Sequence, residues 1–204
     1  MLDNETILIV DYGSQYTQLI ARKIREHNVY CLVHPYNKIG SKILINKNIS
    51  GIILSGGPNS VKDKKSPKLD KKILSLNIPI LGICYGLQLL CKEFGGNIEQ
   101  SSSREYGHSL INHKNKSLLF KGVKKTSQVW MSHGDHIERS PNGFVVTSVS
   151  KNNVIASIEN KSLNPYQYTW LNSFAKLTNI QKNFEIDYWG VSNKNLQKKI
   201  VEYE

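Results

Sequence analysis

Cys84 lies in the segment Gly82-Ile83-Cys84-Tyr85-Gly86, between an apolar run that predicts a strand and a helical pattern. A nucleophile on a sharp strand-to-helix turn needs small neighbours, because its backbone is strained and packs closely on both sides. Such a turn also places the thiol at a helix N-terminus, where oriented N–H groups favour the thiolate. The pattern therefore predicts a nucleophilic cysteine; the alternative is a cysteine that only fills the end of a buried strand.

A second glycine-rich turn, Ser55-Gly56-Gly57-Pro58, follows another apolar run. Adjacent parallel strands bring their C-terminal turns to the same edge of a sheet, so this turn is expected beside Cys84. A glycine N–H group there could join the N–H of Tyr85 in stabilising the oxyanion of a tetrahedral intermediate. The alternative is a plain tight turn.

The elements that must position these turns are visible as short β-branched runs alternating with helical patterns. Strands are predicted over 6–10, 29–33, 51–54 and 78–83, and helices over 15–26, 67–76 and 85–94, with Ser14 as a cap of the first helix. Apolar strands that alternate with helices indicate a parallel sheet buried on both faces. Shorter strands over 109–112, 128–131, 144–148 and 154–159 are expected to extend or cover it. The predicted fold class is therefore a three-layer α/β domain around a central, mostly parallel sheet.

Five segments carry a resemblance to a known family. They are IVDYGSQYTQLIARKIRE at 9–26, GIILSGGPNSV at 51–61, SPKLDKKIL at 66–74, ILGICYGLQLLCKEFGG at 80–96 and VWMSHGDHIERSPNGF at 129–144. Together they resemble the class I glutamine amidotransferases, in the branch formed by the amidotransferase domains of GMP synthetases. The resemblance covers about residues 5–160 in order, and it implies a flavodoxin-like strand order.

The resemblance also implies a reaction. Cys84 would attack the side-chain amide of glutamine and release ammonia, and water would free glutamate from the thioester. The matching positions are Gly57 and Tyr85 for the oxyanion hole, and Gln88, Ser132 and Asp135 for the amino-acid end of glutamine. The plainer interpretation of Gln88 is an exposed polar helix residue, and that of Asp135 is an acidic loop residue.

Ammonia would pass to an ATP-pyrophosphatase module that aminates XMP to GMP, and nothing in this chain resembles that module. ATP and Mg²⁺ are therefore expected only in the partner module, and no cofactor is expected here. The three cysteines, Cys31, Cys84 and Cys91, lack the spacing of a disulfide framework or a metal site. No metal is expected either.

The sequence departs from the family after residue 160. The family's general base is a histidine oriented by glutamate, in a GVQFHPE motif that follows the strand matching 154–159. Here no histidine follows His136, and Gly190 is the one glycine beyond residue 160. We therefore expect an amidotransferase domain over 1–160 and a divergent segment of uncertain structure over 161–204.

His136 and Glu138 reproduce the H-x-E spacing and are candidates for a substitute base, although ordinary surface positions are the plainer interpretation. Two hypotheses follow. One is the glutaminase part of a GMP synthetase. The other is a catalytically impaired or inactive amidotransferase-like binding protein, or a truncated or chimeric gene product.

The net charge of +11 does not point to nucleic acid. The densest lysine run, within 62–72, is interrupted by Asp63 and Asp70 and has no aromatic residue for stacking on bases. A solvated face is expected there, with a docking patch for an acidic partner as the alternative. No apolar stretch is long enough to span a membrane, and the N-terminus is unlike a signal peptide, so the expected location is the cytoplasm.

Overall fold

The structure, a computed structural model, describes residues 6–40, 43–44, 48–114, 117, 120, 122–160 and 168–171. Its described strands form one sheet in the order β2-β1-β3-β4-β9-β8-β6-β5-β7. The parallel strands are β2 (Tyr30–Pro35), β1 (Thr6–Asp11), β3 (Ile49–Leu54), β4 (Ile80–Ile83) and β9 (Tyr168–Leu171). The antiparallel strands are β8 (Ile155–Asn160), β6 (Thr126–Arg139), β5 (Asn97–His113) and β7 (Phe144–Ser150).

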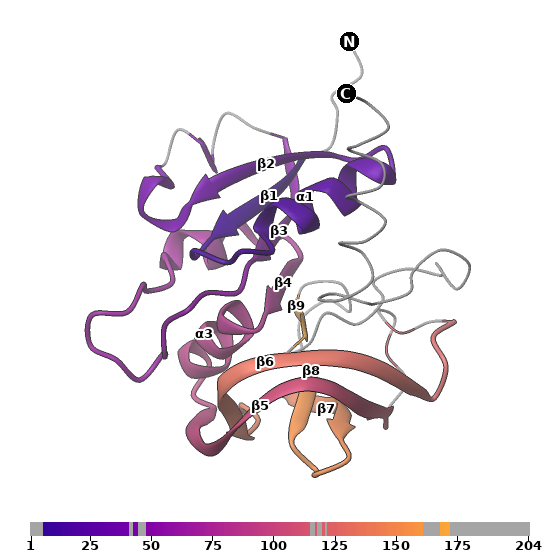
Figure 1. Ribbon diagram of the computed structural model, residues 1–204. Helices are drawn as coiled ribbons and strands as arrows, with labels where there is room; N and C mark the ends of the chain where they lie inside the picture. The colour runs from indigo at the N-terminus through magenta and orange to yellow at the C-terminus, as the bar shows by residue number, and fades with distance from the viewer. Residues whose placement is uncertain are drawn as a thin grey trace, which may run out of the picture.

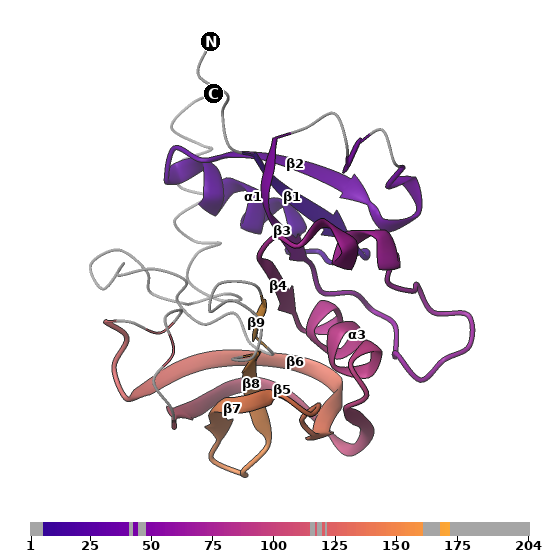
Figure 2. The same cartoon turned by 180° about the vertical axis from the view of Figure 1, so that it is seen from behind.

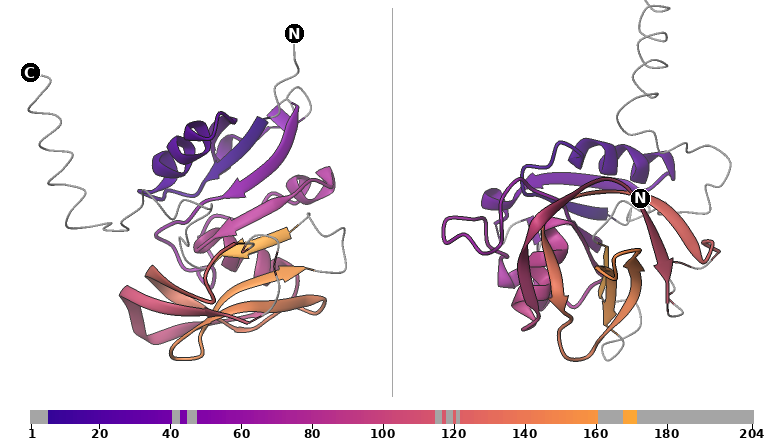
Figure 3. Two further views of the ribbon diagram at one scale, coloured as in Figure 1. Left: turned by 90° about the vertical axis from the view of Figure 1, so that its right-hand side faces the viewer. Right: turned by 60° about the horizontal axis from the view of Figure 1, so that its bottom comes forward.

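Two α-helices cover opposite faces of the parallel strands. In α1 (Thr17–Glu26), Ile20 packs with Ile9 of β1, whereas in α3 (Tyr85–Glu93) Leu87 packs with the neighbouring Val10. Successive side chains of a strand point to opposite faces, so the two helices lie on either side of the sheet. The left view of Figure 3 shows this arrangement. The predicted three-layer α/β class is confirmed.

The antiparallel half is built around a long ribbon of β5 and β6. Figure 1 shows this ribbon curving below the parallel strands, and Figure 2 shows α3 between the two halves from behind. The sequence predicted only short strands at 109–112 and 128–131. These lie inside strands of 17 and 14 residues.

The helix predicted over 67–76 is wrong in type and extent. The segment forms a short 3-10 helix, η2 (Lys71–Leu76), and another, η1 (Tyr36–Lys38), follows β2. The Asp70 carboxylate accepts a hydrogen bond of 3.0 Å from the Lys72 N–H, so the helix begins after Asp70 and not at Pro67. Asn77 ends the helix in the left-handed region, at φ +53°. Helix α1 also begins later than predicted, and the Ser14 hydroxyl accepts from the Tyr16 N–H at 3.1 Å just before it.

Strand β9 lies between β4 and β8 in the sheet. It pairs parallel with β4, with Ile80 opposite Tyr168, and antiparallel with β8. The sheet therefore continues past residue 160, while the division into a 1–160 domain and a 161–204 segment stays a prediction. In the described part of the chain, no helix has the length and apolar character needed to cross a membrane.

Candidate functional site

The backbone at Cys84 is strained. Its φ is +49° and its ψ is −109°, in a region that residues with a side chain rarely adopt. The residue lies between the end of β4 and the start of α3, and its carbonyl accepts the N–H of Gln88 at 3.0 Å in the first helical turn. The predicted strand-to-helix elbow is therefore present, with the cysteine at its tip.

The two glycines that flank the elbow are required by close backbone approach. A Cβ atom on Gly82 would lie 2.7 Å from the Leu87 nitrogen, and one on Gly86 would lie 2.3 Å from the Leu54 carbonyl oxygen. Both distances are far shorter than ordinary contacts. The prediction that the nucleophile needs small neighbours is confirmed, and the neighbouring strand β3 supplies part of the reason.

The Ser55-Gly56-Gly57-Pro58 turn lies against the elbow. A Cβ atom on Gly56 would lie 3.6 Å from the Cys84 Cβ, and one on Gly57 only 2.7 Å from the Tyr12 carbonyl oxygen. The Gly86 N–H also donates to the Ser55 carbonyl at 3.1 Å. The parallel pairing of β3 with β4 thus brings the two glycine-rich turns together, as expected.

Gln88 and Asp135 meet beside the first turns of α3. Both are buried, and the Gln88 side-chain amide donates to the Asp135 carbonyl at 2.8 Å. The Asp135 Oδ2 accepts from the Ser60 hydroxyl at 2.6 Å and from the Val61 N–H at 3.1 Å. These two bonds fix the orientation of the Asp135 carboxylate.

The family model for the class I glutamine amidotransferases matches residues 8–168, which include this whole arrangement. The chain belongs to the class I glutamine amidotransferase family.

Curated relatives of this amidotransferase chain include GMP synthases described as glutamine-hydrolyzing. That of Natranaerobius thermophilus is 47% identical over 81% of this chain and 32% of the relative. That of Acetivibrio thermocellus is 48% identical, again over 81% of this chain and 32% of the relative. The chain thus spans about a third of the length of these relatives.

Solved structures agree with the fold. A protein of Thermoplasma acidophilum described as a putative GMP synthase subunit superposes with a TM-score of 0.67 at 26% identity, over 83% of each chain. A glutamine amidotransferase from Thermotoga maritima gives a TM-score of 0.66 at 19% identity, over 83% of this chain and 75% of the other. At that identity, the second comparison supports the fold alone.

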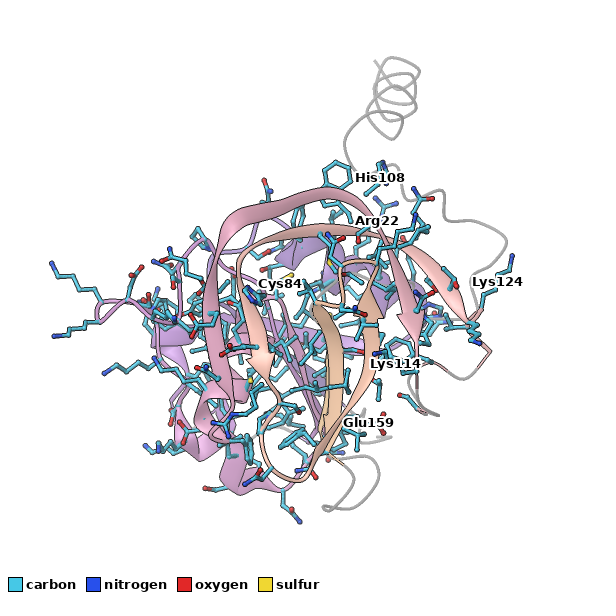
Figure 4. The ribbon with its side chains drawn as sticks, turned by 90° about the horizontal axis from the view of Figure 1, so that it is seen from below. Arg22, Cys84, His108, Lys114, Lys124 and Glu159 are labelled. Carbon is cyan, nitrogen blue, oxygen red and sulfur yellow. The ribbon has the colours of Figure 1, made fainter. Side chains whose placement is uncertain are left out.

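Burial governs the acidity of the Cys84 thiol. It raises the pKa of the Cys84 thiol from an ordinary 9.0 to about 12. In Figure 4, seen from below, Cys84 lies near the middle of the view and Lys124 at its edge, and Cys84 is partly rather than fully buried. Desolvation penalises the thiolate and acts against the helix N-terminus, which was expected to favour it. The raised pKa favours the protonated thiol.

The structure places the candidate substitute base along β6. Gln88 bonds to the Asp135 carbonyl, and Cys91 bonds to the Arg139 carbonyl. Helix α3 and this part of β6 therefore run side by side in the same direction, away from Cys84. His136 follows Asp135 in this direction. Glu138 is exposed, and its carboxylate accepts from the Asn97 side chain. A role for His136 and Glu138 as a base stays a prediction.

The remaining predicted positions are placed in part. The backbone of Ser132 lies in β6 opposite Tyr106, but its side chain is outside the described residues. Tyr85 is buried, and its hydroxyl donates to the Pro67 carbonyl at 2.5 Å, so its ring is fixed beside the elbow. The roles of Gly57 and Tyr85 in an oxyanion hole stay predictions.

Sequence reasoning missed Ser60 and Val61, which hold the Asp135 carboxylate. They are separated from it by 75 and 74 residues, and no local pattern marks such a contact. It also missed the Asp11 carboxylate, whose Oδ1 accepts from the Gly13 N–H and the Thr17 hydroxyl and fixes the loop beside Gly57. That signal was available, because an aspartate two residues before a glycine typically closes such a turn.

Proposed function

We propose that this amidotransferase chain is the glutaminase part of a GMP synthase. Cys84 attacks the side-chain amide carbon of glutamine, the C–N bond breaks, and the nitrogen leaves with an added proton as ammonia. Water then hydrolyses the thioester to glutamate and restores the thiol. The observation that carries the proposal is the strained elbow at Cys84, with the Ser55–Pro58 turn packed against it.

The N–H groups of Gly57 and Tyr85 are proposed to bind the oxyanion of the tetrahedral intermediate. Support comes from the close packing of both turns at one sheet edge. Gln88, Ser132 and Asp135 are proposed to hold the amino-acid end of glutamine, with the buried Asp135 as the partner of its ammonium group.

The ammonia is proposed to reach an ATP-pyrophosphatase module that binds ATP and Mg²⁺ and converts XMP to GMP in the cytoplasm. The GMP synthases of N. thermophilus and A. thermocellus support this partner, because each is about three times as long as the region that this chain matches. Neither nucleic acid nor a membrane is part of the proposed reaction.

The thiol proton needs an acceptor, because a pKa of about 12 keeps the sulfur protonated at neutral pH. The candidate base is His136, which would have to reach Cys84 from a part of β6 that runs away from it; Glu138, its candidate partner, bonds to Asn97 instead. Its test is His136→Ala, which should lower glutamate release without changing glutamine binding. An unchanged rate would remove His136 from the mechanism.

The whole proposal is tested by measuring glutamate release from glutamine, with the synthetase module of the A. thermocellus relative present. Cys84→Ala is the control and should abolish release. If the unaltered chain and Cys84→Ala give the same rate, the glutaminase proposal fails, and binding of glutamine by calorimetry would then identify a binding protein.

A further inference from the structure

Ser55, the first residue of the glycine-rich turn, is fully buried and bonded at four points. Its N–H donates to the Val10 carbonyl at 3.0 Å, and its carbonyl accepts from the Gly86 N–H at 3.1 Å. Its hydroxyl group accepts from the Tyr12 N–H at 3.0 Å and donates to the Gly56 carbonyl at 2.9 Å. The backbone of Ser55 thus bonds to β1 and to the elbow, and its side chain bonds to the loop after β1 and to the turn.

The direction of the hydroxyl hydrogen follows from these partners. A backbone N–H can only donate, so the Ser55 oxygen must be the acceptor from Tyr12. The hydroxyl hydrogen is then free to point at the Gly56 carbonyl. This bond holds the carbonyl on the side of Ser55.

The same bond sets the direction of the Gly57 N–H. In a trans peptide, the carbonyl of one residue and the N–H of the next point in opposite directions, so fixing the Gly56 carbonyl fixes the Gly57 N–H. The peptide joins two glycines, which have no Cβ atom to resist its rotation. A side-chain hydrogen bond is therefore an effective way to lock it.

We propose that Ser55 is a positioning residue for the oxyanion hole: its hydroxyl holds the Gly56–Gly57 peptide so that the Gly57 N–H faces the carbonyl oxygen of the substrate that Cys84 attacks. The bond from the Gly86 N–H to the Ser55 carbonyl ties the preceding peptide, Ser55–Gly56, to the elbow. The inference rests on the proposed function, because it assigns the Gly57 N–H to an oxyanion formed during attack by Cys84.

The test compares two alkylating probes on the full chain, followed by mass spectrometry of the peptide that contains Cys84. The first is the chloroketone of glutamine, L-2-amino-4-oxo-5-chloropentanoate. Its carbon–chlorine bond breaks as a carbon–sulfur bond forms, chloride leaves, the thiol proton passes to solvent, and the neighbouring ketone oxygen gains negative charge on the way. The second is iodoacetamide, a simple displacement that needs no oxyanion hole.

For Ser55→Ala we expect the maximal chloroketone rate to fall about tenfold, with the half-saturating concentration unchanged, because the oxyanion donor is misplaced rather than removed. The iodoacetamide rate should stay within about twofold, because access to the thiol and its pKa do not change. Ser55→Thr keeps the hydroxyl and should restore the chloroketone rate. Ser148→Ala is the matched control, a buried serine of β7 bonded to Ser157, and should alter neither rate.

Thermal unfolding of each variant checks that it is folded. If Ser55→Thr does not fold because its methyl group does not fit, the ratio of the chloroketone rate to the iodoacetamide rate in Ser55→Ala still tests the positioning role. Equal losses with both probes, or no loss with the chloroketone, would overturn the positioning role while leaving the proposed function intact. If the unaltered chain reacts no faster with the chloroketone than with iodoacetamide, and glutamine gives no protection, the proposed function fails and this inference fails with it.

Discussion

At the scale of single residues, Cys84 combines a strained backbone with a partly buried side chain, and desolvation raises the pKa of its thiol. A pKa raised to about 12 favours the thiol over the thiolate at neutral pH. The elbow therefore supplies position and a close fit to its neighbours, but not a thiolate. Under the proposed function, a base must take the thiol proton when glutamine is bound.

Alkylation of Cys84 by iodoacetamide should consequently rise about tenfold for each pH unit between 7 and 10, because only the thiolate reacts. The pKa is raised, so the ionised fraction keeps growing until about pH 12. The measurement is the labelling rate of Cys84 by mass spectrometry, with glutathione as the reference thiol. A plateau below pH 9 would show an activated thiolate and contradict this expectation.

Gly86→Ala should destabilise the domain by at least about 3 kcal/mol, because the new Cβ atom would lie 2.3 Å from the Leu54 carbonyl oxygen. Urea unfolding gives the free energy. Gly40→Ala is the matched control, since a Cβ atom there would meet nothing within 4 Å. Comparable stability of the two variants would mean that the backbone of the elbow can shift to accommodate an added methyl group.

At the scale of elements, the parts specified by local sequence were predictable and those specified by distant pairing were not. The apolar runs of β1 and β3 and the glycines around Cys84 are short-range signals, and each predicted the right element. The β5–β6 ribbon was underestimated because residues such as Glu99 and Gln100 are polar and depend on the partner strand for their structure. The contacts of Asp135 with Ser60 and Val61 were missed for the same reason.

The loop after β3 is tied to β6 through Ser60. We expect Ser60→Ala to reduce stability by about 1–2 kcal/mol, because the buried Asp135 carboxylate loses a hydrogen bond. Glutamine affinity should fall as well, since Asp135 is then held less firmly. Urea unfolding and calorimetric titration measure the two effects, and the exposed Ser75→Ala is the control. Weaker unfolding stability with unchanged glutamine affinity would argue against Asp135 as the ammonium partner.

At the scale of the whole molecule, the positive charge is spread over an outer surface and partly paired. Lys62 bonds to Glu99 at 3.0 Å and Lys71 to Glu93 at 2.7 Å, and such solvent-accessible pairs contribute little to stability. The lysine-rich segment thus fits the expected solvated face. The feature that matters more for the whole domain is β9, which joins the parallel and antiparallel halves of the sheet.

Removal of residues 161–204 deletes β9 and leaves the facing edges of β4 and β8 without a partner. We expect the 1–160 fragment to unfold at lower urea concentration and to self-associate, because unpaired edges pair with other chains. A 1–175 fragment, which keeps β9, is the control. Size-exclusion chromatography measures the self-association, and urea unfolding measures the stability. A monomeric 1–160 fragment as stable as the full chain would instead support a domain that ends at residue 160.

The place of β9 also has a consequence for synthesis on the ribosome. The chain emerges from its N-terminus, so β4 and the cysteine at its end are made long before the strand that will lie next to them. During translation β4 remains an edge strand of the growing sheet, and the surroundings of Cys84 are complete only when residues 168–171 have left the exit tunnel. In a nascent chain stalled before that point, β4 and the Cys84 at its end would lack the neighbouring strand β9.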